Sequence, residues 1–246
     1  LGPGSRVPFT IEQPTEKLSV IDGKVIVAGT GPIGLSQRFC AIVRKAWSHD
    51  HIFTNPPLDV AKELCRRTLQ DFQHTFIVPG PPQPSHPFIG SVRYSALVGF
   101  PHSKTPYLCE FTADHFQPEF KTKRLWYVSM GIAQTITDSF LGFIRDIFWQ
   151  TGPPALFDGI FTATWTLEHA IQVSPIAVRG PPQIAVLGYG KKGQLEARIL
   201  SQVEVDEYRQ SVKDAKEYLR KFPERYQPEA AEDLEVPKLA PLKKGS

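Results

Sequence analysis

The sequence is poor in cysteine, with only Cys40, Cys65 and Cys109 among 246 residues. The three are far apart, and they fall on two expected helices and one expected strand. An odd number of widely spaced cysteines excludes both a disulfide framework and a zinc ribbon. We therefore expect buried thiols with no structural bridge between them.

Long apolar runs are also missing. No stretch of 18 or more apolar residues occurs, and Leu1–Ser5 lacks the basic flank and apolar core of a signal peptide. These absences favour a soluble, cytoplasmic protein without a membrane partner.

The chain has little excess charge of either sign. Its 28 Lys and Arg residues are interspersed with 25 Asp and Glu residues, which leaves a formal charge of +3. Nucleic-acid binding normally requires a basic patch, so we expect no nucleic-acid partner.

Several catalytic and ligand-binding motifs are absent. The sequence contains no G-x-S-x-G, H-E-x-x-H, Walker loop or C-x-x-C. The segment Ser48–His51 offers two imidazoles and a carboxylate to a metal, but His-x-His on a loop is more often solvated. His169 is similarly expected to be a packed residue. No metal or organic cofactor is predicted.

The remaining composition describes one sizeable globular unit. Hydrophobic residues make up 41% of the chain, enough to bury a single large core. Asp22-Gly23 separates the strand-like runs 17–21 and 24–28, and this dipeptide is the strongest short hairpin signal. The proline-rich segment Pro79–Pro87 cannot form regular structure and is expected to be a surface loop.

Helices and strands are expected in alternating blocks. Apolar residues recur at helical spacing in two segments after the first hairpin, in two more before residue 172, and in one C-terminal segment. The expected strands after the first hairpin are 92–99, 107–111, 116–120, 125–128, 183–188 and 195–201. Helix pairs between blocks of strands favour helices layered on both sides of paired sheets, unlike the regular alternation of a parallel sheet.

The glycine segment after the second strand allows two interpretations. Gly29, Gly31 and Gly34 match the G-x-G-x-x-G dinucleotide fingerprint between a strand and a helix. However, the second parallel strand and its terminal acid are missing, and a hairpin partner precedes the glycines. A dinucleotide-binding enzyme is therefore the least favoured hypothesis.

The second interpretation comes from a family resemblance. The segments 17–21, 24–31 and 35–39 resemble the third strand, fourth strand and first helix of proteasome β-subunits and related N-terminal nucleophile (Ntn) hydrolases. The order of elements continues this resemblance to about Phe222. It implies a four-layer αββα sandwich of two antiparallel sheets, with the first hairpin of the family apparently missing. Residues 17–222 would form that domain, after an N-terminal segment 1–16 and before a flexible tail 223–246.

The resemblance also implies a chemistry. In the family an N-terminal threonine attacks a peptide carbonyl with its own α-amine as the base. Lys17 matches the lysine that tunes this proton transfer, and Gly31 matches the glycine whose amide stabilises the oxyanion. Alternatively, Lys17 is a solvated residue at a strand edge and Gly31 a simple turn residue.

Other positions depart from the family pattern. Residue 1 is Leu, Thr10 and Thr15 are internal, and Ser129-Met-Gly131 stands where the family has a Gly-Ser-Gly turn. The expected function is a subunit of a bacterial, self-compartmentalising threonine peptidase whose nucleophile is not in this chain. The alternative is a catalytically degenerate, ring-forming scaffold with the same fold.

Aromatic residues are concentrated on the third and fourth expected helices, between Phe140 and Trp165, beyond what one buried stripe needs. Excess apolar surface usually marks an interface. The resemblance implies a homo-oligomer of stacked rings that acts on peptides or unfolded proteins.

Overall fold

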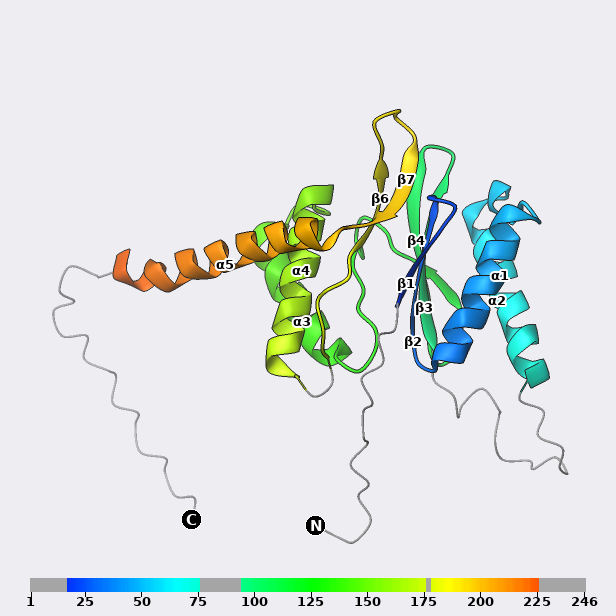
Figure 1. The fold of residues 1–246 in the computed structure, drawn as a ribbon, viewed down its shortest axis with the longest axis horizontal. Coiled ribbons are helices and arrows are strands. Elements are labelled where there is room, and N and C mark those ends of the chain that lie inside the picture. The colour runs from blue at the N-terminus through cyan, green and yellow to red at the C-terminus, as the bar shows by residue number, and fades with distance from the viewer. Residues whose placement is uncertain (1–16, 76–93, 176–177, 226–246) are drawn as a thin grey trace, which may run out of the picture.

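The computed structural model describes residues 17–75, 94–175 and 178–225 (Figure 1). The predicted segment 1–16, the predicted loop Pro79–Pro87 and residues 226–246 of the predicted tail lie outside this part of the chain.

The larger of two sheets is fully antiparallel and has its five strands in sequence order. These strands are β1 (Leu18–Ile21), β2 (Val25–Thr30), β3 (Ser95–His102), β4 (Thr105–Phe111) and β5 (Pro118–Phe120). The predicted first hairpin is confirmed. Asp22 and Gly23 have φ values of 47° and 62°, the left-handed pair that a tight hairpin turn requires.

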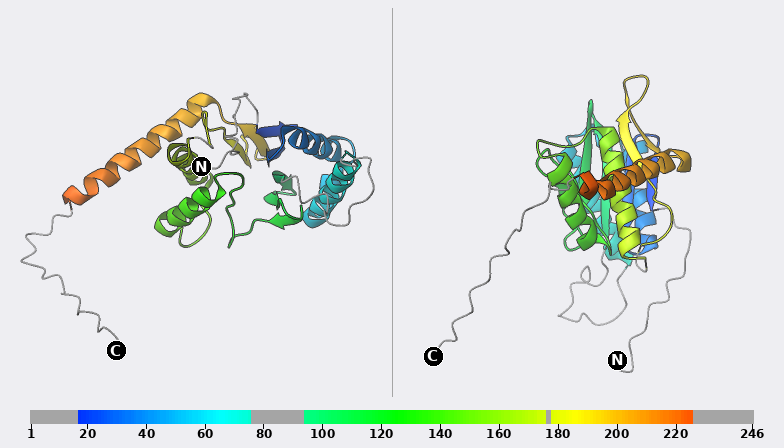
Figure 2. Two further views of the ribbon diagram at one scale, coloured as in Figure 1. Left: turned by 90° about the horizontal axis from the view of Figure 1, so that it is seen from below. Right: turned by 90° about the vertical axis from the view of Figure 1, so that its left-hand side faces the viewer.

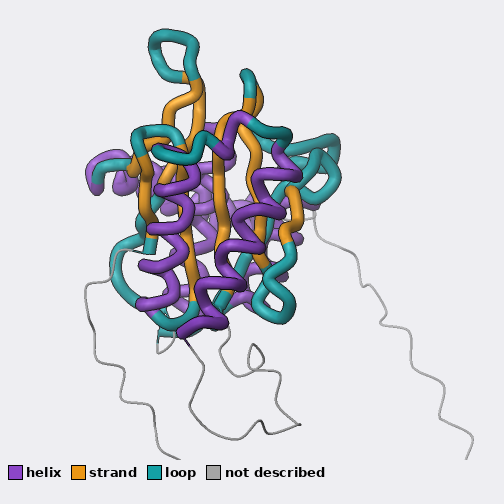
Figure 3. The backbone as a smooth tube through the Cα atoms, turned by 90° about the vertical axis from the view of Figure 1, so that its right-hand side faces the viewer, coloured by secondary structure: helices purple, strands orange, loops and turns teal. Residues whose placement is uncertain are grey.

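Two helices cover one face of this sheet, α1 (Ile33–Ser48) and α2 (Pro57–Thr75), with a short 3₁₀ turn, η1 (Ile52–Thr54), between them (Figure 3). The main core forms here, because strands and helices direct their apolar positions toward each other. Phe39 of α1 and Phe100 of β3 are completely buried in it. Phe39 makes an edge-on contact with Phe111 at 5.4 Å between ring centroids.

The opposite face carries a two-stranded antiparallel sheet, β6 (Ala185–Tyr189) and β7 (Leu195–Ile199). It is tied to the first hairpin by two hydrogen bonds. The Ala197 amide donates to the Gly23 carbonyl at 2.7 Å, and Lys24 Nζ donates to the Leu195 carbonyl at 2.7 Å. The sheets are thus held together at the β1–β2 turn.

Three further helices lie beyond the small sheet, on the far side from α1 and α2 (Figure 1). They are α3 (Gln134–Phe148), α4 (Leu156–Val173) and α5 (Gln202–Arg225). Ile144, Trp165 and Val212, one from each helix, form a small buried cluster.

The predicted mixed α+β fold with antiparallel sheets is confirmed. The predicted strand at 125–128 is wrong, since these residues form a loop without strand pairing. Trp126 contacts Trp149, just after α3, at 6.0 Å between ring centroids, so its aromatic side chain packs on a helix instead of on a sheet.

The cysteines are where the sequence placed them. Cys40 is on α1, Cys65 on α2 and Cys109 on β4, all three as free thiols. Burial raises the pKa of the Cys109 thiol to about 12, which leaves it protonated and unreactive at neutral pH. Among the described helices, none has the length and apolar character needed to cross a bilayer.

Candidate functional site

Lys17 and Gly31 lie at the same end of the large sheet, where β1 begins and β2 ends. Lys17 directly precedes β1 and is exposed, while Gly31 directly follows β2 and is also exposed. The register pairs Leu18 with Ala28, so the start of β1 lies beside the end of β2. The fold therefore brings the two predicted site residues to one end of the molecule, although their chemical roles remain predictions.

Gly31 adopts a backbone conformation that other residues rarely take. Its φ is 121°, and Pro32 then begins α1 without a side-chain cap. The peptide groups around Gly31 are consequently presented at the surface immediately before the helix N-terminus, where backbone amides favour negative charge.

A second glycine turn packs against this end of the sheet. Gly131 has a φ of 97°, and a Cβ added there would lie 3.0 Å from Thr30 Oγ1. Two residues earlier, the Ser129 hydroxyl donates a hydrogen bond to the Asp138 carboxylate on α3. Residues about 100 positions apart in the sequence, Thr30 and Gly131, thus meet in one cluster.

This cluster was only partly foreseen. The sequence identified Ser129 and Gly131 as departures from a family pattern, but it gave no signal for Thr30 or Asp138. The contact of Thr30 with Gly131 depends on how the loop after β5 crosses to α3, and no local motif encodes that path.

The Tyr94 phenol is a polar group packed tightly against Gly29, near the end of β2. A Cβ added at Gly29 would lie 2.5 Å from Ser36 Oγ and 2.9 Å from the Tyr94 hydroxyl. The Tyr94 hydroxyl is buried beside Ser36 without completing a hydrogen bond, and burial raises its pKa. Gly29 is therefore required for close packing between β2, α1 and Tyr94.

The dinucleotide hypothesis does not fit this geometry. β2 pairs antiparallel with β1 on one side and β3 on the other. The glycine segment accordingly lacks the parallel βαβ unit in which G-x-G-x-x-G binds a pyrophosphate.

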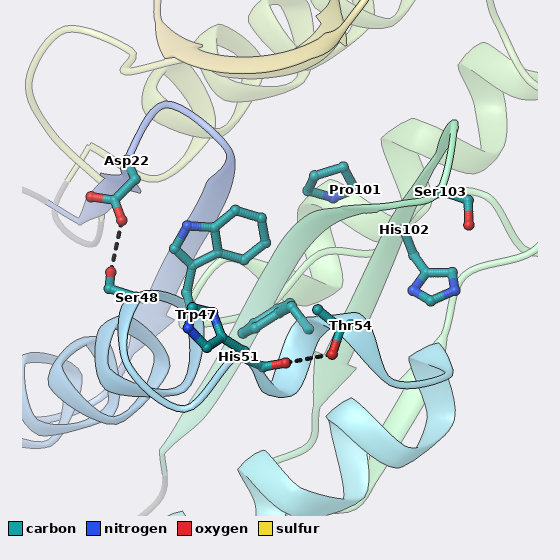
Figure 4. A pocket seen from close by; sticks show the side chains of 9 residues that line it. Asp22, Trp47, Ser48, His51, Thr54, Pro101, His102 and Ser103 are labelled. Atoms are coloured by element: carbon teal, nitrogen blue, oxygen red, sulfur yellow. Dashed lines mark hydrogen bonds between the residues drawn. The ribbon is translucent and has the colours of Figure 1, made fainter.

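An open pocket of about 570 Å³ lies at the opposite end of the large sheet (Figure 4). It is lined by the β1–β2 turn, the end of α1 with η1, and the β3–β4 turn. Asp22, His51 and Ser103 in its lining have positive φ values of 47°, 51° and 55°. The Ser48 hydroxyl donates to the Asp22 carboxylate at 2.7 Å.

The two histidine regions singled out from the sequence lie apart, on the η1 side and on α4. The described residues contain no group of three or more His, Cys, Asp or Glu side chains placed to hold a metal ion. His169 stacks on Phe140 at 4.3 Å between ring centroids, and burial lowers its pKa. It is the packed residue that the sequence favoured.

Comparison with known proteins finds similarity at the level of structure. No family model and no curated protein matches the sequence. Anbu, the ancestral β-subunit, from Yersinia bercovieri superposes with a TM-score of 0.59 at 10% identity, covering 87% of this chain and 88% of that one. Anbu from Hyphomicrobium sp. strain MC1 gives 0.60 at 11% identity, covering 90% and 88%.

These findings correct the family assignment made from the sequence. Identification as an Ntn hydrolase and bacterial proteasome homologue is wrong as a statement of membership, because no family model matches. The identity of 10–11% to the two Anbu structures demonstrates a shared fold and nothing finer.

Proposed function

We propose that the chain is one subunit of a proteasome-like homo-oligomeric assembly in the cytoplasm. The observation that carries this proposal is the fold likeness to the two Anbu proteins over 87% and 90% of the chain. The proposal includes the four-layer order of α1–α2, the large sheet, the small sheet and α3–α4.

The finer part of the proposal is hydrolysis of amide bonds in peptides or unfolded proteins. In this proposal the nucleophile is an N-terminal threonine with a free α-amine, whereas residue 1 of the printed sequence is Leu. The exposed amide at the Gly31 turn supplies the oxyanion contact, and Lys17, at the same end of the sheet, tunes the threonine electrostatically.

A specific observation supports the alternative of a non-enzymatic scaffold. The Ser129 hydroxyl is engaged with the Asp138 carboxylate, and Lys17 is exposed to solvent. An exposed lysine has little electrostatic influence, because water screens its charge.

The test is covalent labelling of the complete native chain. An electrophile that reacts with both a threonine hydroxyl and its free α-amine is added, and intact mass is recorded together with native mass. One adduct per subunit on a multi-subunit particle supports the peptidase. A particle without an adduct supports the scaffold, and an unlabelled monomer refutes both.

Lys17→Ala tests the role of Lys17 in the finer proposal, and a second lysine variant is its control. It should slow labelling by at least about tenfold if Lys17 tunes the nucleophile, since an effect of that size corresponds to one pKa unit. Lys62→Ala alters an exposed lysine on α2 and should leave the labelling rate unchanged.

A further inference from the structure

Helix α5 extends well beyond the body of the molecule. At 1.5 Å per residue, its 24 residues span about 36 Å. Figures 1 and 2 show it running away from both sheets, past the α3–α4 pair, so that its C-terminal half stands clear of the other elements.

The first half of α5 is firmly packed. Val205 and Val212 are 1% and 0% exposed, and Val212 shares its buried cluster with Ile144 of α3 and Trp165 of α4. Tyr208 contacts Phe157 at 5.2 Å between ring centroids. This half anchors the helix on the α3–α4 layer.

The apolar stripe continues after the anchor ends. Leu219 lies seven residues, or two helical turns, after Val212, so it points to the same side of α5. Its exposure nevertheless rises to 52%. The stripe that packs on the helical layer in the first half thus faces solvent in the second.

The outer flank of α3 is a second apolar surface that no other described element covers. Phe143 and Ile147 are one turn apart and are 55% and 52% exposed. The inner side of α3 already packs on α4, since the Phe140 and Trp165 ring centroids are 5.9 Å apart. Within the part of the chain that the structure describes, Phe143 and Ile147 therefore stay more than half exposed.

The charges of the two surfaces are complementary. Beyond Val212, α5 carries five Lys or Arg residues and three acids. Lys216 and Arg220 flank Leu219, whereas the exposed Asp146 lies between Phe143 and Ile147 on α3.

From these faces we infer that the C-terminal half of α5 packs on the outer flank of α3 in a second copy of this chain. Leu219 of one copy packs between Phe143 and Ile147 of the other. Lys216 and Arg220 of the first copy then lie beside Asp146 of the second. Each copy donates one helix and receives one, so the contact joins two different surfaces of the same chain and can repeat from copy to copy. The inference specifies one contact of the proposed assembly and rests on that proposal for the identity of the partner.

Native mass spectrometry of the full chain over a dilution series tests the contact. Leu219→Asp and Phe143→Asp should each raise the dissociation constant at least about tenfold, as loss of a central apolar anchor does. Lys221→Asp, on the opposite side of α5, should leave it unchanged. Circular dichroism of every variant checks that the fold is retained.

A crosslinking experiment identifies the surfaces directly. Leu219→Cys protein is mixed with isotopically labelled Ile147→Cys protein, both in a Cys40→Ser background, and treated with a short bismaleimide. A crosslinked dimer with one copy of each kind is expected, while Lys221→Cys in place of Leu219→Cys should give none.

The outcomes separate this contact from the proposed function. An assembly that resists Leu219→Asp and yields no mixed crosslink overturns the α5 contact but leaves the assembly standing. A wild-type protein that is monomeric at all concentrations overturns both.

Discussion

At the scale of single residues, Gly29 is a position where packing leaves no room for a side chain. Gly29→Ala should lower the free energy of unfolding by about 2 kcal/mol, because the new methyl would lie 2.5 Å from Ser36 Oγ and 2.9 Å from the Tyr94 hydroxyl. Urea unfolding measures the change. Gly34→Ala, with open space around the added methyl, should instead gain up to about 1 kcal/mol through helix propensity. Equal effects at both positions would contradict the packing explanation.

The most buried ion pair also gives a residue-scale prediction. Lys121 Nζ lies 2.7 Å from both Glu110 and Glu119, and the Lys121 side chain is 5% exposed. Burial opposes its charge, but the two carboxylates outweigh burial and raise the pKa of Lys121. Lysine therefore stays charged beneath the surface.

Glu110→Gln should cost about 2 kcal/mol in urea unfolding, because it leaves a buried ammonium with one carboxylate. Glu119→Gln should cost less than about 1 kcal/mol, since Glu119 is 50% exposed and its pairing is screened. A larger loss of stability for Glu119→Gln than for Glu110→Gln would show that burial does not control the strength of these ion pairs.

At the scale of elements, α2 carries a pH-sensitive cluster. A hydrogen bond from Arg66, supported by Arg67, lowers the pKa of Glu63 to about 2 from an ordinary value near 4.5. The stabilisation is therefore complete above about pH 4.5 and is lost as the pH falls toward 2.

Glu63→Gln should flatten the dependence of the urea midpoint on pH between about 4.5 and 2. Glu217→Gln removes the partner of Lys221 in an exposed pair on α5 and serves as the control. A variant whose pH dependence in this range matches the wild type would rule out Glu63 as the source.

Local patterns predicted the elements better than they predicted the contacts among them. The Asp22-Gly23 turn and the amphipathic α1 and α2 were recognisable because their signals lie within a few residues. The run at 125–128 has strand-like residues, yet Trp126 packs beside α3 and the strand does not form. The proximity of Thr30 to Gly131 is likewise a product of chain path, which periodicity does not encode.

At the scale of the whole molecule, two features favour assembly. On α3, Phe143 and Ile147 are more than half exposed, and on α5 Tyr218 and Leu219 are more than half exposed as well. Exposed apolar surface of this kind is costly in an isolated subunit and is normally buried by a partner.

Single-particle imaging of the purified native chain at micromolar concentration tests the proposed assembly most directly. We expect closed particles of several identical subunits, with ring-shaped projections. A homogeneous population of single subunits, or irregular aggregates without symmetry, would contradict the proposal that this chain is a subunit of a proteasome-like assembly.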